Sequence, residues 1–189
     1  SGVAWMMAVT ILGGLVCQWP VGWLSDRFGY RTIPVSLAFL ALALAARLSE
    51  RGIPTRLTVV GCRVPEATSS GIVDWVGPID KATPAGEAEI ARLLGESHFL
   101  CLPSRADCTP IVLCEAAAYG LPAVSVRTGG IGSVLTHGGN GFLFGLDGFV
   151  EEAAESIARC MADHDGLYAP LAMASYEEYV SRLNWAASA

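Results

Sequence analysis

The stretch FLCLPSRADCTPIVLCEAAAYGLPAVSV, residues 99–126, decides the fold of this chain. Its two short apolar runs, 99–103 and 122–126, have the length and composition of buried strands. The segment between them, 110–119, is predicted as a helix that stops at the Gly-Leu-Pro sequence 120–122. Two such strands joined through a helix are typical of a parallel sheet with crossover connections.

The same alternation extends on both sides of this stretch. Further strands are predicted at 57–61, 73–77 and 141–144, and further helices at 87–94, 149–161 and 171–183. Short loops separate these elements. From about residue 42 onward we therefore expect an α/β domain with a Rossmann-like, doubly wound, mostly parallel sheet.

Charge and cysteine spacing exclude several classes of function. The formal net charge is −6 and Lys81 is the only lysine, so no basic cluster exists to bind nucleic acid. The six cysteines form no C-x-x-C pair and no spacing typical of Cys/His metal ligands. We expect neither a metal site nor a cofactor.

The first 46 residues differ in composition from the predicted α/β domain. Residues 1–24 contain no charged side chain, and a helix of that length would measure about 36 Å, against about 30 Å for the core of a bilayer. A second uncharged stretch, 32–46, would form a helix of only about 23 Å. We expect an apolar helical hairpin over 1–41, with membrane association through 1–24. If only the first segment crosses, the remaining domain is cytoplasmic.

Two acids frame the predicted helix start in the loop–helix segment. Thr109 is a suitable N-cap, and the first N–H groups, those of Ile111 and Val112, would face the sheet's carboxyl edge and favour an anion. Asp107 precedes the helix and Glu115 lies along its flank. Carboxylates accept hydrogen bonds from paired hydroxyls, so the arrangement suits a phosphate between two polyols, as in a nucleotide sugar. The alternative is a surface acid beside a helix acid that favours the positive helix end.

Residues 102–144, LPSRADCTPIVLCEAAAYGLPAVSVRTGGIGSVLTHGGNGFLF, resemble the donor-binding core of family 4 glycosyltransferases, whose fold has two facing Rossmann domains. The similarity extends over about 42–189. It implies that Asp107 meets the hexose hydroxyls of the donor and Glu115 the ribose, beside the Gly129–Gly130 loop. It also implies a retaining, metal-independent transfer from a UDP- or GDP-linked sugar.

The chain departs from that family in three ways. The first acid is usually Glu rather than Asp107, and Pro110 stands where Gly is common. The family's basic donor-phosphate motif and its N-terminal acceptor domain should precede residue 42. We therefore expect a donor-binding domain that is incomplete and inactive as this chain alone, with no residue assigned as catalytic.

The loop GWLSDRFGYR is similar to a G-x-x-x-D-R-x-G-x-R loop of major facilitator superfamily transporters. The matching positions are Gly22, Asp26, Arg27, Gly29 and Arg31. The alternative is an ordinary charged turn between apolar helices, but the uncharged span that precedes the loop favours the transporter-like interpretation. Two alternative functions follow, a fragment of a membrane transporter and a binding module without catalysis.

Overall fold

The computed structural model describes residues 32–61, 71–104, 107 and 110–184, with side chains from residue 39 onward. The chain divides into two compact units, Ser1–Ser36 and Leu37–Ala189, and the elements below belong to the second unit apart from the start of the first helix. The predicted membrane segment, 1–24, lies outside the described residues. So do the five positions of the transporter-like loop, Gly22, Asp26, Arg27, Gly29 and Arg31.

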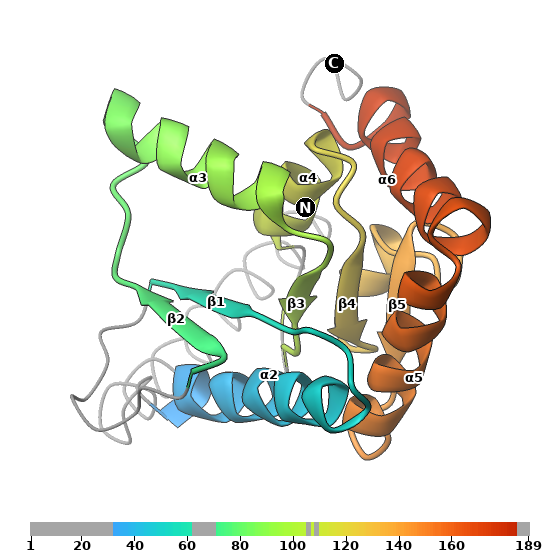
Figure 1. The fold of residues 1–189 in the computed structure, drawn as a ribbon. Coiled ribbons are helices and arrows are strands. Elements are labelled where there is room, and N and C mark those ends of the chain that lie inside the picture. Colours follow the sequence, from blue (N-terminus) through green and yellow to red (C-terminus); the bar gives the residue numbers. More distant parts are fainter. Residues whose placement is uncertain (1–31, 62–70, 105–106, 108–109, 185–189) are drawn as a thin grey trace, which may run out of the picture. The chain divides into compact units, whose positions relative to one another are not determined.

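Strands and helices alternate along the described chain, as predicted (Figure 1). The strands are β1 (Leu57–Val60), β2 (Val73–Val76), β3 (Leu100–Leu102), β4 (Ala123–Val126) and β5 (Gly141–Phe144). The helices are α2 (Thr32–Glu50), α3 (Pro84–Glu96), α4 (Ile111–Ala118), α5 (Phe149–Ala162) and α6 (Ala169–Ser181), with a 3-10 turn at Ile131–Ser133 and a π-helical turn at His164–Tyr168. The predicted α/β class is confirmed.

The described strands form two parallel sheets instead of one. β1 pairs with β2, with Leu57 opposite Val73. β4 lies between β3 and β5, with Ala123 opposite both Leu100 and Gly141. No pairing joins β1 to β3 among the described residues, so the sheet that carries β3, β4 and β5 is the frame for the predicted site.

Alternate residues of the three-stranded sheet pack on opposite faces, as the period of a strand requires. Val124 and Phe144 lie on one face, where they pack with Phe149 of α5 and with Leu44 and Leu48 of α2. All five side chains are buried. The second apolar stretch of the sequence therefore supplies a helix whose later turns cover this face.

The other face of the same sheet has a separate core. Ala123 and Leu143 pack there with Leu113 of α4 and with Ile131 and Leu135 of the segment after β4. Helical segments on both faces explain why the four residues of β4 are all buried. This packing fixes the start of α4 against the carboxyl ends of β3 and β4.

Helix α2 is also tied to α5 at the surface. Arg47 and Arg51 approach the carboxylate of Glu151 to 2.9 and 3.3 Å. Exposed pairs of this kind contribute about 0–1 kcal/mol each, so burial of Leu44 and Leu48 dominates the contact. None of the helices in the described ranges combines the length and the hydrophobicity that a bilayer crossing requires.

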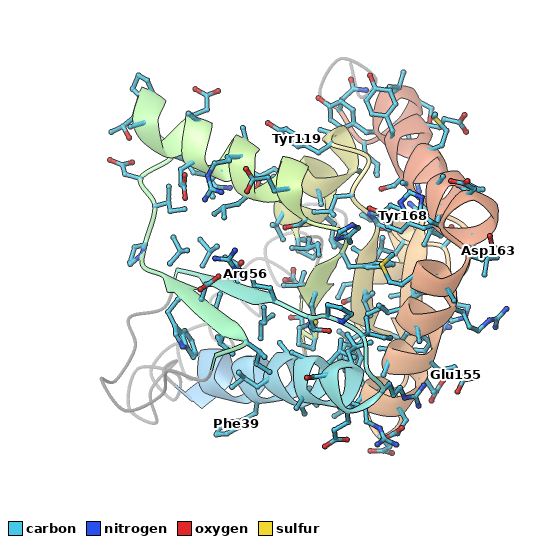
Figure 2. The ribbon with its side chains drawn as sticks, viewed as in Figure 1. Phe39, Arg56, Tyr119, Glu155, Asp163 and Tyr168 are labelled. Carbon is cyan, nitrogen blue, oxygen red and sulfur yellow. The ribbon has the colours of Figure 1, made fainter. Side chains whose placement is uncertain are left out.

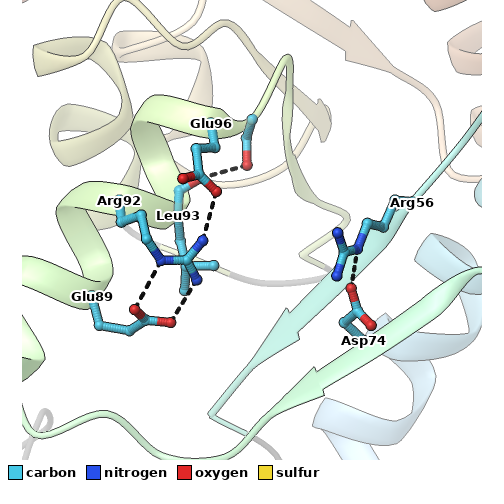
Figure 3. Close-up of polar contacts among 7 residues, drawn as sticks. Arg56, Asp74, Glu89, Arg92, Leu93 and Glu96 are labelled. Carbon is cyan, nitrogen blue, oxygen red and sulfur yellow. Dashed lines mark hydrogen bonds and ion pairs between the residues drawn. The ribbon is translucent and has the colours of Figure 1, made fainter.

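Ion pairs mark the surface of the two-stranded sheet and of α3 (Figure 3). Arg56 pairs with Asp74 between β1 and β2. On α3, Arg92 bridges Glu89 at 2.7 Å and Glu96 at 2.6 Å, one turn away in each direction. These side chains are solvent-accessible, and their contribution to stability is correspondingly small.

The turn between α5 and α6 was not predicted from the sequence. Asp163 ends α5, and its carboxylate accepts a hydrogen bond of 2.9 Å from the N–H of Gly166. Tyr168 follows Asp163 in this turn (Figure 2). Its hydroxyl donates to the carbonyl of His98 at 3.1 Å. A local side-chain cap of this type competes with a regular helix and shortens α5.

Candidate functional site

The candidate site lies where β3 and β4 end and α4 begins (Figure 1). After β3 the chain turns at once, since the N–H of Ser104 donates to the carbonyl of Leu102 at 2.8 Å. The buried hydroxyl of Ser125, near the end of β4, donates to the same carbonyl at 2.5 Å. The carboxyl ends of the two strands are thus held together by a shared acceptor.

The structure brings Asp107 and the Gly129–Gly130 loop into direct contact. The N–H of Gly130 donates to the backbone carbonyl of Asp107 at 3.1 Å. Gly129 adopts a φ of +49°, and a Cβ at that position would lie 1.9 Å from the same carbonyl oxygen. Only glycine permits this approach, so the glycine loop fixes the position of the first acid. Asp107 is partly buried.

Helix α4 begins one residue later than predicted. Pro110 is its N-cap, with an extended ψ of 117°, and its carbonyl accepts from the N–H of Leu113 at 3.0 Å. The predicted cap, Thr109, lies outside the described residues. Ile111 is 64% exposed and Val112 is partly buried, so the first turn reaches the surface. Its N–H groups are the ones that an α-helix leaves without intrahelical partners.

The end of α4 follows the predicted stop. Gly120 has a φ of +64°. Its N–H donates to Ala117, and the N–H of Leu121 donates to Ala116, at 2.9 and 3.0 Å. These two bonds form a Schellman motif, which needs a left-handed residue just beyond the helix. The predicted Gly-Leu-Pro stop is confirmed.

Glu115 has a partner that the sequence did not predict. The ammonium group of Lys81 lies 2.6 and 2.8 Å from its two carboxylate oxygens. Lys81 comes from the turn before α3, and both side chains remain partly exposed, at 52% and 34%. Lys81 is the single lysine of the sequence, which made it noticeable. Its distance along the chain from Glu115 gave no indication that the two side chains are in contact.

The segment after Gly130 is held firmly on the sheet. Asn140 is 2% exposed. Its side-chain oxygen accepts from the N–H of Thr136 at 2.7 Å, and its amide donates to the carbonyl of Val134 at 2.9 Å. From α6, Arg182 donates to the carbonyl of Ser133 at 2.7 Å. The glycine loop therefore has a rigid continuation on one side.

Two thiols near the site stay protonated at neutral pH. Burial raises the pKa of Cys101 in β3 to about 12. Burial also raises the pKa of Cys114 on α4, and the neighbouring Glu115 adds to this effect while Arg182 opposes it. A thiol must ionise to act as a nucleophile, so these side chains are structural.

Other features of the described residues lie apart from this site. A cavity of about 600 Å³ is lined by β1, α3, β3 and α2, and none of the predicted donor-binding residues lines it. No group of three or more His, Cys, Asp or Glu side chains within the described ranges is placed to hold a metal ion.

The start of α4 offers backbone donors, two acids and one partly exposed cation. Together these groups suit a ligand with hydroxyl groups and phosphate.

Comparisons with known proteins agree with this fold. The family model described as "Glycosyl transferases group 1" matches residues 30–163. A stretch of 54 residues is 41% identical to N-acetyl-alpha-D-glucosaminyl L-malate synthase of Bacillus anthracis, over 29% of this chain and 14% of that protein. The match gives no support to the transporter-fragment alternative.

Solved structures provide a second comparison. HepE from Anabaena, in complex with UDP, is 25% identical with a TM-score of 0.51, over 60% of this chain and 29% of that chain. Sucrose-phosphate synthase from Thermosynechococcus elongatus is 22% identical with a TM-score of 0.60, over 77% and 39% of the two chains. The chain thus spans well under half the length of each of these three proteins. Since the family model covers more than half of its residues, the chain belongs to the group 1 glycosyltransferases.

Proposed function

We propose that this chain binds the nucleotide-sugar donor of a glycosyltransferase that transfers a hexose to an acceptor. The observation that carries the proposal is the contact between Asp107 and the Gly129–Gly130 loop beside the start of α4. This contact places an acid and a glycine turn at a helix N-terminus, where backbone N–H groups favour a phosphate. The HepE structures with UDP and with UDP-glucose support a donor of this chemical class.

The predicted residues have the following roles in this proposal. Asp107 accepts hydrogen bonds from the hexose, and Glu115 from the ribose. The N–H groups of Ile111 and Val112 receive the diphosphate beside the Gly129–Gly130 loop, whose Gly130 N–H already donates to Asp107, and Pro110 takes the cap position predicted for Thr109. The proposal also includes the finer assignment to family 4. On this assignment the donor is UDP- or GDP-linked, the transfer retains configuration, and it needs neither a metal nor a cofactor.

The domain division is part of the same proposal. Residues 42–189 form the donor-binding domain, which works with an acceptor-binding domain and lies in the cytoplasm. Residues 1–41 form an apolar segment that associates with the membrane through 1–24 and ends within helix α2. The family match begins at residue 30, which extends it into the end of that segment.

Isothermal titration of the chain with UDP-glucose and GDP-mannose tests donor binding. We expect one of the two to bind and Glu115→Gln to weaken it about 5- to 150-fold, equivalent to about 1–3 kcal/mol, since a neutral amide replaces a charged acceptor. Glu96→Gln is the matched control, because Glu96 is also paired with a basic side chain, that of Arg92, but lies on α3.

Two results would count against the proposal. If a folded sample gave no heat with either donor up to millimolar concentration, the chain would lack the site. If donor binding were equally strong in wild type and Glu115→Gln, Glu115 would not be a ligand. A chain that kept its cellular role with Glu115→Gln would instead be a binding module without catalysis.

A further inference from the structure

The ion pair between Lys81 and Glu115 joins two parts of the chain 34 residues apart in sequence. The ammonium group contacts both carboxylate oxygens, at 2.6 and 2.8 Å. The ammonium group of Lys81 therefore occupies the carboxylate oxygens of Glu115, which the proposed function assigns to the donor ribose. The lysine side chain is half exposed, so a ligand in solution has access to the pair.

The backbone of Lys81 is anchored although its side chain is exposed. In the turn before α3, the carboxylate of Asp80 accepts from the N–H of Ala82 at 3.0 Å, and the hydroxyl of Thr83 donates to the carbonyl of Asp80 at 2.9 Å. Thr83 also caps α3 by accepting from the N–H of Gly86 at 3.1 Å. The Cα of Lys81 is thus held in place, and its four-carbon side chain can change direction.

An exchange of partners at this pair is energetically accessible. Partly exposed ion pairs are weak because water screens the two charges. Hydroxyl groups that bond to Glu115 would compete with the ammonium for the same oxygens. A released ammonium favours a new anion, and a ligand with a phosphate next to a ribose supplies one within the same molecule.

We propose that Lys81 is a phosphate-binding residue that pairs with Glu115 in the empty site and moves to the donor diphosphate when the ribose takes its place. The inference rests on the proposed function and adds a cation to it. Lys81 is the single lysine of the sequence, and it would supply positive charge to the diphosphate from the β2–α3 turn. Binding of the ribose and binding of the phosphate are then coupled through one side chain.

Titrations with UDP and with uridine test this inference on wild type and on Lys81→Met, which keeps most of the side-chain length and removes the charge. We expect Lys81→Met to weaken UDP binding about tenfold or more, since a charge-assisted hydrogen bond is lost. Uridine has no phosphate, and its affinity should stay the same or rise up to about fivefold, because its competitor for Glu115 is gone.

Three controls make the result specific. Lys81→Arg keeps the charge and should retain most of the UDP affinity. Arg56→Met removes an equal charge next to β1, and should leave the UDP-to-uridine ratio unchanged. Urea unfolding checks that each variant is folded, and Lys81→Gln repeats the measurement if Lys81→Met is not.

The outcomes separate this inference from the proposed function. If wild type binds UDP and the UDP-to-uridine ratio is the same in Lys81→Met, the phosphate role is refuted and the donor site stands. If Lys81→Met binds both ligands more tightly, Lys81 is only a competitor and the phosphate role is again refuted. If wild type binds neither ligand, the proposed function fails and the role of Lys81 fails with it.

Discussion

Replacement of Gly129 by alanine probes the contact that carries the proposed site. In the structure, the new Cβ would lie 1.9 Å from the carbonyl oxygen of Asp107 and 3.0 Å from its carbonyl carbon. Heavy atoms cannot approach so closely, so the loop around Asp107 must move away. The hydrogen bond of 3.1 Å from Gly130 to the same oxygen would be lost or lengthened.

Three contributions determine the expected magnitude. The φ of +49° at Gly129 costs an alanine about 1–2 kcal/mol. Loss of the hydrogen bond adds about 0.5–1.5 kcal/mol, and the displaced loop adds strain of about the same size. We therefore expect Gly129→Ala to lower the free energy of unfolding by about 2–5 kcal/mol. Gly138 has a φ of +74°, and a Cβ added there would meet no atom within 4 Å, so Gly138→Ala isolates the backbone cost.

Urea unfolding followed by circular dichroism measures these differences. With a slope of about 2 kcal/mol per molar urea, Gly129→Ala should shift the midpoint by about 1–2.5 M, and Gly138→Ala by about 0.5–1 M. Gly132→Ala, at an open position without a positive φ, should leave it unchanged. Equal midpoints for the Gly129 and Gly138 variants would refute the close approach of the two loops.

The remaining predictions concern the frame of the site. Ser125→Ala removes the buried hydrogen bond to Leu102 and should destabilise the fold by about 1–3 kcal/mol in urea unfolding, whereas the exposed Ser133→Ala should cost less than about 1 kcal/mol. Asn140→Ala removes two hydrogen bonds and should cost about 2–4 kcal/mol; a loss below about 1 kcal/mol would contradict its role in holding the loop. Because burial raises the pKa of Cys101 from 9.0 to about 12, the unfolded chain loses this proton first as the pH rises. Its contribution to the free energy of unfolding should therefore fall between about pH 9 and 12, and iodoacetamide at about pH 8 should modify Cys101 far more slowly in the folded chain than in urea.

Local patterns in the sequence were sufficient for the elements of the fold. The apolar runs at 57–61, 73–77 and 141–144 became β1, β2 and β5 with at most one residue of difference. Strand length, glycine stops and helical periodicity act over a few residues, so each can be recognised without knowledge of the rest of the chain. The helix start at Pro110 differed by one residue because a proline can be either a cap or a first-turn residue.

The division of the strands into two sheets was decided by tertiary structure. Five strands with parallel connections are compatible with one sheet, and the local sequence of β1 and β3 does not say whether their edges pair. Pairing depends on which backbone edges are brought together by the whole fold. The structure pairs β1 with β2 and β3 with β4, and leaves the two groups separate among the described strands.

The residues of the candidate site illustrate the same division. By itself the sequence determined that Asp107 and Glu115 lie on either side of a helix start and that a glycine turn follows the next strand. Only the tertiary structure decided that the Asp107 carbonyl meets Gly130 and that Lys81 meets Glu115. The physical reason is that such contacts depend on where distant loops return in space, which no local propensity encodes.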